Sequence, residues 1–207
     1  YTFLTGRYAG SSYCRQYRTL FPPGQQASPG FNVDLESDNM NIGGLLARNG
    51  YATGFVGKYH VGPEAVYQFD TALPGNARSP VEMANRCQAF IESDDKRPFF
   101  LYFCTSDPHR SGGSVAGDKH KANPFGNRPE GYPGVTTMKY DPADVVVHPF
   151  LPDTPVCRAE LAQYYQSVSR IDQGLGRLIE VLKKAGVYDQ TLIIYTSDHG
   201  IAFPGGK

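Results

Sequence analysis

The sequence predicts an α/β fold in which helices flank a mostly parallel sheet. Three segments with helical periodicity each precede a short, almost continuous apolar run, and this alternation is typical of parallel sheets. The 207 residues are enough for one domain or a large part of one. Of these residues, 40% are hydrophobic, which is enough to form a core.

The first helix is predicted at about residues 38–49, and the first strand follows at Tyr51–Val56. Leu45 and Leu46 lie on the apolar side of this helix. Gly50 is the expected stop, because glycine readily adopts the left-handed conformation that ends helices.

The second helix is predicted to begin at Ser79 and to end near Ser93. Ser79, Pro80 and Glu82 form a capping box with proline at the first helical position, which is typical of a helix start. The second strand is predicted at Phe99–Cys104, an aromatic run.

The third helix is predicted at about residues 155–185, and the third strand at Thr191–Tyr195. The apolar stripe of this helix has spacings of three and four: Tyr164, Val168, Ile171, Leu175, Leu178 and Leu182. Residues 106–153 show no period and are rich in Gly, Pro, His and Asp. We interpret them as a long irregular excursion over the active face, because long loops are usually functional or disordered.

The composition argues against two classes of partner. The chain has 20 basic and 20 acidic residues, so nothing indicates binding to nucleic acid or to a membrane surface. No apolar run approaches the roughly 20 residues that span a bilayer. The four cysteines are too widely spaced for a zinc knuckle or a redox pair, and we expect unpaired or buried thiols. They are Cys14, Cys87, Cys104 and Cys157.

Ionisable side chains follow each predicted strand, where an open parallel sheet binds its ligands. Lys58 and His60 follow the first strand, two residues apart, so in an extended segment they face the same side. The lysine suits an anionic oxygen and the histidine can move a proton near neutral pH. The alternative is a surface lysine beside a histidine packed under a loop.

His109 and Arg110 follow the second predicted strand. The histidine could protonate a leaving group while the arginine holds an anion. The alternative is a loop histidine that caps a backbone carbonyl.

Asp198 and His199 follow the third predicted strand. A carboxylate at a strand end suits a hard divalent cation, and the histidine could be a further ligand or contact the substrate. Lys207 follows in a Gly-rich loop and could reach the same anionic group as Lys58 and Arg110. The alternative is a turn in which Asp198 caps the next residues. His120 and His148 are expected on the surface of the excursion. Together these groups predict a metal-assisted hydrolase of a tetrahedral oxyanion ester, either sulfate or phosphate.

A short segment at the start of the chain resembles a known family. Leu4-Thr5-Gly6-Arg7 is similar to the second half of the type I, formylglycine-dependent sulfatase signature. The first half, Cys-x-Pro-x-Arg or its serine form, would lie immediately before Tyr1. The blocks around Lys58, His109 and Asp198 resemble further sulfatase blocks in the same order.

Within the family the chain most resembles the heparan N-sulfatases, or sulfamidases. The residues that carry this likeness are His60 to Glu64, Tyr67, Phe69, Asp70, Asp107 to Arg110, Tyr140 to Pro142, Arg170, Asp172 to Gly174, and Gly200, Ile201, Phe203 and Pro204.

The resemblance implies an alkaline-phosphatase-like fold, with residues 1–207 as part of the N-terminal catalytic domain. It implies hydrolysis of a sulfate ester or N-sulfate on a sugar such as N-sulfoglucosamine, with formylglycine as nucleophile and Ca²⁺ as cofactor. Asp198 and His199 would be calcium ligands, although the family often has Asn at the second position. Lys207 would bind sulfate where sulfamidases have Arg.

The resemblance also implies three catalytic roles. Lys58 would hold a sulfate oxygen, His60 would contact the hydrated aldehyde, and His109 would be the acid for the leaving group. Because the nucleophile would precede Tyr1, we interpret both ends as artificial boundaries and expect this chain alone to be inactive.

The implied partner is a sulfated saccharide, and the implied location is extracytoplasmic: lysosomal, periplasmic or secreted. The sequence does not indicate an oligomeric state. Two alternatives stay open, a phosphodiesterase or phosphonate hydrolase of the same superfamily and a non-catalytic module that binds sulfated glycans.

Overall fold

A computed structural model describes most of the chain, and these residues form two compact units. The described residues are 4, 40–59, 67–110 and 121–206. The first unit, here the sheet unit, comprises Tyr1–Leu73 and Asp94–Phe103. The second, here the helix unit, comprises Pro74–Ser93 and Cys104–Lys207.

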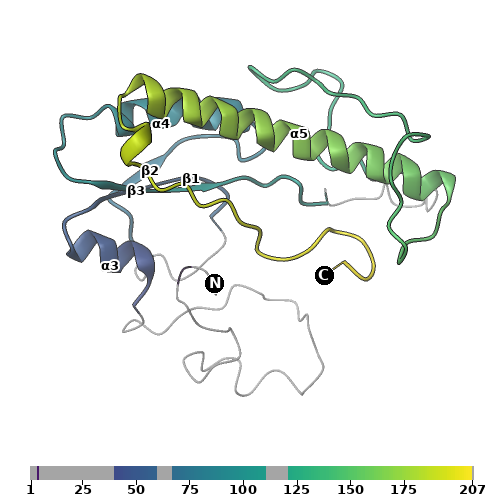
Figure 1. Ribbon diagram of the computed structural model, residues 1–207, viewed down its shortest axis with the longest axis horizontal. Coiled ribbons are helices and arrows are strands. Elements are labelled where there is room, and N and C mark those ends of the chain that lie inside the picture. The colour runs from purple at the N-terminus through teal and green to yellow at the C-terminus, as the bar shows by residue number, and fades with distance from the viewer. Residues whose placement is uncertain (1–3, 5–39, 60–66, 111–120, 207) are drawn as a thin grey trace, which may run out of the picture. The chain divides into compact units, whose positions relative to one another are not determined.

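The sheet unit contains three strands among the described residues, in the order β2-β1-β3 (Figure 1). They are β1 at Ala52–Gly57, β2 at Thr71–Leu73 and β3 at Phe99–Cys104. β1 and β2 pair in parallel, with Gly54 opposite Thr71. The predictions of β1, β3 and parallel pairing are therefore confirmed, whereas β2 was not predicted.

A reciprocal pair of hydrogen bonds positions β2. The Thr53 amide donates to the Asp70 carboxylate and the Asp70 amide donates to the Thr53 hydroxyl, both at 3.0 Å. Thr53 is fully buried, so these bonds also satisfy polar groups that would be costly to leave unpaired. The residue before β2 is thus held against β1 by side-chain contacts.

The short helix α3 spans Ile42–Arg48, inside the range predicted from residue 38. Asn41 sets its start, because its side-chain oxygen accepts a 3.0 Å hydrogen bond from the Gly44 amide. Gly50 follows the helix with a φ of 82°, which confirms the predicted stop.

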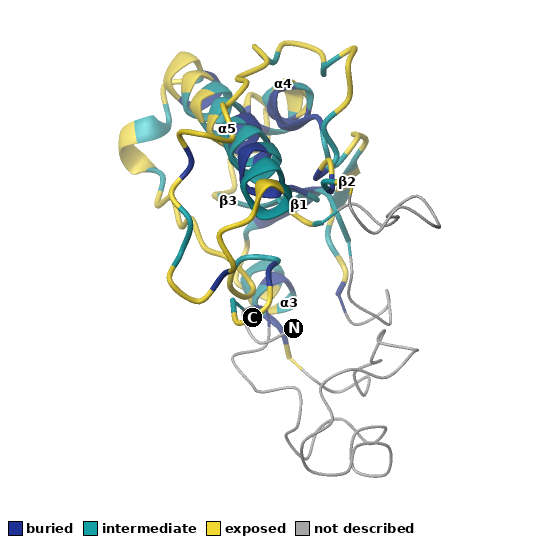
Figure 2. Ribbon diagram, turned by 90° about the vertical axis from the view of Figure 1, so that its right-hand side faces the viewer, coloured by how far each residue is buried: buried dark blue, intermediate teal, exposed yellow. Residues whose placement is uncertain are grey.

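The helix unit contains α4 at Pro80–Ile91, α5 at Pro155–Lys184 and the 3-10 turn η1 at Tyr188–Gln190. Both predicted helices are confirmed, and α5 is buried along one side and exposed along the other (Figure 2). No helix in the described ranges has the length and apolar character needed to cross a membrane.

The start of α4 differs from the prediction in its capping. The predicted capping box is wrong, because the Ser79 side chain makes no capping hydrogen bond. Ser79 has a φ of −117° and a ψ of 68°, and its buried hydroxyl has no partner among the described residues. Pro80 nevertheless stands at the first helical position, as predicted.

The contact between α4 and α5 depends on a glycine. A Cβ at Gly174 would lie 2.9 Å from the carbonyl carbon of Pro80 and would also clash with the proline ring. Gly176, two residues later in the same helix, has nothing within 4 Å. The absence of a side chain at Gly174 therefore lets the two helices approach.

We expect Gly174→Ala to lower the free energy of unfolding by about 1–3 kcal/mol, because the helices must move apart. Gly176→Ala, the matched control, should raise it by up to about 1 kcal/mol through helix propensity. Urea unfolding of both variants checks this. Equal shifts in the same direction would contradict the packing argument.

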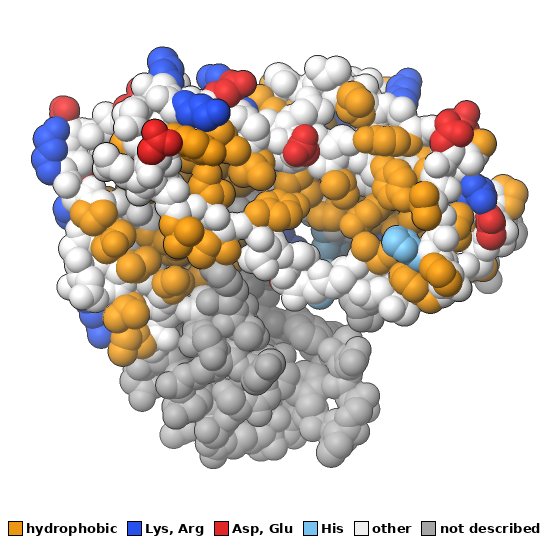
Figure 3. Space-filling model, in the orientation of Figure 1, with side chains coloured by type: hydrophobic (Ala, Val, Ile, Leu, Met, Phe, Trp, Pro, Cys, Tyr) orange, Lys and Arg blue, Asp and Glu red, His pale blue; other side chains and the backbone are white. Residues whose placement is uncertain are grey.

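Residues Thr191–Tyr195 do not form the predicted strand. They have no regular secondary structure, and Leu192 is 84% exposed. No neighbouring strand is bonded to them within the described part of the chain, and a single strand without a partner is not stable. The space-filling view shows hydrophobic side chains gathered on one face of the molecule (Figure 3).

The excursion is irregular, as predicted, but it is packed. Its described residues, 106–110 and 121–153, contain neither helix nor strand. Phe125, Val145 and Leu151 are nonetheless buried against Leu161 of α5. This core holds the loops in place without hydrogen-bonded secondary structure.

Two cysteines of the helix unit, Cys87 and Cys157, are unpaired thiols, as expected. Cys14 lies outside the described residues. Burial raises the pKa of Cys87 from its ordinary value of 9.0 to about 12.

The raised pKa predicts that Cys87 resists alkylation. At pH 8 its thiolate fraction, and hence its rate with iodoacetamide, should be about a thousandfold below that of an ordinary cysteine. Mass spectrometry of the native and the urea-unfolded protein tests this. Modification of Cys87 at equal rates in both states would contradict it.

Candidate functional site

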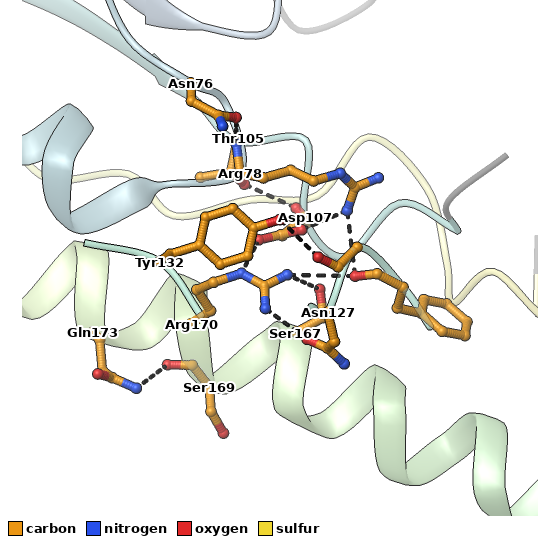
Figure 4. Close-up of polar contacts among 12 residues, drawn as sticks. Asn76, Arg78, Thr105, Asp107, Asn127, Tyr132, Ser167, Ser169, Arg170 and Gln173 are labelled. Atoms are coloured by element: carbon orange, nitrogen blue, oxygen red, sulfur yellow. Dashed lines mark hydrogen bonds and ion pairs between the residues drawn. The ribbon is translucent and has the colours of Figure 1, made fainter. Parts of the chain in front are cut away.

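A buried ionic cluster lies just after β3 and is centred on Asp107 (Figure 4). The Asp107 side chain is 0% exposed and stands between two guanidinium groups. Its Oδ1 accepts from Nη1 of Arg78 at 2.7 Å, and its Oδ2 accepts from Nε of Arg170 at 2.7 Å. Both carboxylate oxygens are therefore held by charged donors.

The other two nitrogens of the Arg170 guanidinium also donate hydrogen bonds. Nη1 donates to the Asn127 side chain at 2.6 Å, and Nη2 donates to the Ser167 hydroxyl at 3.3 Å and to the Phe125 carbonyl at 3.4 Å. The guanidinium also lies 4.6 Å from the centre of the Tyr132 ring. The Arg170 side chain is 3% exposed, and each of its three guanidinium nitrogens donates a hydrogen bond, which offsets the cost of burying the charge.

The turn that carries His109 is built on this cluster. The Ser106 amide donates to the Ala77 carbonyl at 2.7 Å, and the His109 amide donates to the Ser106 carbonyl at 2.9 Å. Nη2 of Arg78 donates to the His109 carbonyl at 3.2 Å. Hydrogen bonds therefore hold the backbone of His109 in place, while the residue itself is exposed.

Arg110 pairs with a carboxylate of α5. Its Nη2 lies 2.6 Å from Oε1 of Glu160, and the same oxygen accepts from the Asn123 amide at 3.2 Å. Arg110 is 41% exposed in its side chain, against 11% for Glu160. The arginine charge is thus balanced here, and substrate binding by Arg110 stays a prediction.

Asp198 and His199 lie in the loop after Tyr195. The Asp198 side chain is 85% exposed, and its Oδ2 is 3.5 Å from Nε2 of His199. The Ser197 hydroxyl donates to the His199 carbonyl at 2.6 Å. Nowhere in the described ranges do three His, Cys, Asp or Glu side chains gather as a metal site requires. The described residues thus offer an adjacent pair, far from the six to eight oxygens that calcium takes.

Lys58 belongs to the sheet unit and directly follows β1. Gly57 before it has a φ of 95°, so the chain turns as the strand ends. Lys58 is half-buried, and no carboxylate pairs with it in the part of the chain that is described. Its predicted partner His60, like Lys207, lies outside the described residues.

Two histidines were expected on the surface of the excursion. His148 is half-buried and stacks on Phe150, with ring centres 5.3 Å apart. His120 lies outside the described residues.

The sequence did not single out the arginine cluster as a unit. A signal existed in α5, where Arg170 stands next to Ile171 on the stripe that is buried. A charged residue on an apolar helix face needs a buried partner. The partner itself lies 63 residues away, which local sequence does not reveal.

The fold is an α/β fold of the alkaline-phosphatase-like superfamily. The crystal structure of Ps i-CgsB is similar, with a TM-score of 0.54 and 22% identity. The match covers 96% of this chain and 47% of that one.

The sulfatase family model matches residues 2–207, and the chain belongs to the sulfatase family. This confirms the resemblance drawn from the sequence.

Three curated relatives are similar in sequence to this chain. The human N-sulphoglucosamine sulphohydrolase is 43% identical over 173 residues, which is 79% of this chain and 34% of that protein. An ulvan-active sulfatase of Formosa agariphila is 23% identical over 209 residues, covering 89% and 31%. The multifunctional alkaline phosphatase superfamily protein PehA of Trinickia caryophylli is 26% identical over 166 residues, covering 67% and 31%. The chain spans about a third of the length of these relatives.

Proposed function

We propose that the whole protein hydrolyses a sulfate ester or an N-sulfate on a sugar such as N-sulfoglucosamine, and that this chain is part of its catalytic domain. The observation that carries the proposal is the 43% identity, over 79% of the chain, to a relative named for N-sulphoglucosamine sulphohydrolysis. The candidate residues also keep the order in which sulfatase blocks occur.

Lys58 is the proposed clamp for a sulfate oxygen. Its position supports this role, because it directly follows β1 and no described carboxylate neutralises it. A fixed positive charge beside the reacting group stabilises the charge that develops on the oxygens in the transition state.

His109 is the proposed acid for the leaving group, and His60 is proposed to act at the nucleophile. The overall reaction for an N-sulfate converts R–NH–SO₃⁻ and water into R–NH₃⁺ and SO₄²⁻. The sulfur–nitrogen bond breaks and the electron pair stays on nitrogen, which takes a proton from His109. The exposure of His109 on a fixed turn supports this role.

Asp198 and His199 are proposed as two ligands of a metal whose other ligands lie elsewhere in the protein. Members of the sulfatase family generally use Ca²⁺ and formylglycine. Arg110 and Lys207 are proposed to bind the substrate. Arg110 donates to Glu160 through Nη2, and its guanidinium has five N–H groups in all, so it can hold an anion as well.

The proposed partner is a sulfated saccharide, and the proposed location is outside the cytosol. Both follow from the family alone. The sequence suggested no affinity for nucleic acid or membranes.

A phosphodiesterase of the same superfamily is the second candidate, favoured by the 26% identity to a multifunctional alkaline phosphatase superfamily protein. The whole protein should be assayed with 4-nitrophenyl sulfate, 4-nitrophenyl phosphate and bis(4-nitrophenyl) phosphate. We expect the sulfate ester to have the highest kcat/KM. A faster phosphodiester would favour the second candidate.

Lys58→Ala should lower the kcat for the sulfate ester by about 100-fold or more. Lys96→Ala is the matched control, because Lys96 is an exposed lysine of the same unit. Equal activity of the two variants would remove Lys58 from the site.

A further inference from the structure

We propose that Arg78 is a positioning residue that sets the place of the His109 imidazole, an inference that rests on the proposed role of His109. Arg78 directly precedes Ser79, the residue before α4. It was not among the residues that the sequence pattern selected, and it lies 31 residues from His109.

The planar guanidinium of Arg78 joins both sides of the turn. Nη1 of Arg78 holds the Asp107 carboxylate at 2.7 Å, and Nη2 holds the His109 carbonyl at 3.2 Å. These two acceptors are two residues apart on the turn that projects His109. A guanidinium presents parallel donors in a rigid fork, so it fixes both distances together, whereas an ammonium group does not.

Asp107, two residues before His109, is held through both of its carboxylate oxygens. Its other oxygen is held by Arg170, which is 3% exposed and belongs to α5. The Thr105 hydroxyl donates to the Asp107 carbonyl at 2.8 Å. The turn is therefore tied to the start of α4 through Arg78 and to α5 through Arg170 (Figure 4).

The excursion packs directly on the Arg78 side chain. A Cβ at Gly126 would lie 2.7 Å from Cζ and 2.8 Å from Cδ of Arg78. Gly126 has a φ of 74°, which itself favours glycine. The neighbouring Phe125 carbonyl accepts from Nη1 at 3.3 Å. The guanidinium is thus confined by the excursion as well as by the turn.

A purely stabilising role for Arg78 makes different predictions from a positioning role. If Arg78 only stabilised the fold, its replacement would leave the His109 imidazole of the folded enzyme in its usual position. A positioning role changes the imidazole in the folded state, and a displacement on the order of 1 Å can reduce a rate by about 100-fold. The kcat should fall while KM stays nearly unchanged, because the acid acts only in the transition state.

The first measurement is NMR of histidine ring signals in the whole protein. Arg78→Lys should shift or broaden the His109 signal and leave that of His148 in place. Gly126→Ala, which displaces the guanidinium and changes no charge, should do the same. Arg158→Lys is the control, because Arg158 makes the same kinds of contact with Asp153 and backbone carbonyls of another loop. An unchanged His109 signal in both Arg78→Lys and Gly126→Ala overturns the inference.

The second measurement is a double-mutant cycle on sulfate release. Arg78→Lys should lower kcat by about 10- to 100-fold in the wild-type background and have almost no effect in a His109→Ala background. An equal effect in both backgrounds overturns the inference while the proposed function stands. If the wild type releases no sulfate, the proposed function fails and the NMR result alone decides the role of Arg78.

Discussion

Replacing Arg170 by alanine is expected to lower the free energy of unfolding by about 3–5 kcal/mol, the range for breaking a buried ion pair. Asp107 is fully buried and would keep only one of its two charged donors. Asn127 and Ser167 would lose their contacts with the guanidinium at the same time. The change therefore removes the central charge of a network rather than a single contact.

Urea unfolding of the whole protein tests this expectation, with Arg158→Ala as the control. Arg158 also forms an ion pair, but its side chain is 30% exposed and that of Asp153 is 58% exposed. Water screens such a pair, so the control should change the unfolding midpoint much less. Similar midpoints for the two variants would mean that the buried network does not stabilise the fold.

Replacing His109 by alanine is expected to lower kcat for a sugar N-sulfate by about 10²- to 10⁴-fold, the usual range for a general acid. The amine of the sugar is a poor leaving group and needs a proton as the bond to sulfur breaks. The nitrophenolate released from 4-nitrophenyl sulfate leaves without one. The fall in kcat should therefore be much smaller for the nitrophenyl ester.

Steady-state assays of the variant with both substrates measure this difference. His148→Ala is the matched control, because His148 stacks on Phe150 and has no proposed role in the reaction. An equal loss on both substrates would show that His109 acts in binding or in folding rather than as an acid.

The elements that local signals define could be predicted from the sequence. Pro80 fixes the start of α4, and Thr154 caps α5 by accepting a 3.2 Å hydrogen bond from the Cys157 amide. Gly50 ends α3. Each of these residues acts on its own neighbours, so a window of a few residues contains the information.

Elements that depend on distant partners were missed or wrong. β2 has only three residues, and the contacts between Asp70 and Thr53 span 17 positions. Thr191–Tyr195 has the composition of a buried strand but no strand pairs with it among the described residues. Apolar composition shows that a segment can be buried. It forms a strand only when a neighbouring strand pairs with it through hydrogen bonds.

The candidate site divides in the same way. His109 and Asp198 were predicted from their places after apolar runs, and both prove to be exposed. The support of His109 was not predicted, because Arg78 and Arg170 lie 29 and 63 residues from Asp107. Local pattern thus selects side chains that can react, whereas tertiary contacts determine what holds them.

Sulfate release from N-sulfoglucosamine by the whole protein is the most direct test of the proposed function. Ion chromatography should detect sulfate and glucosamine in equal amounts, and Lys58→Ala should release far less. Sulfated sugar that binds but stays intact would contradict the proposal and favour a glycan-binding protein without catalytic activity.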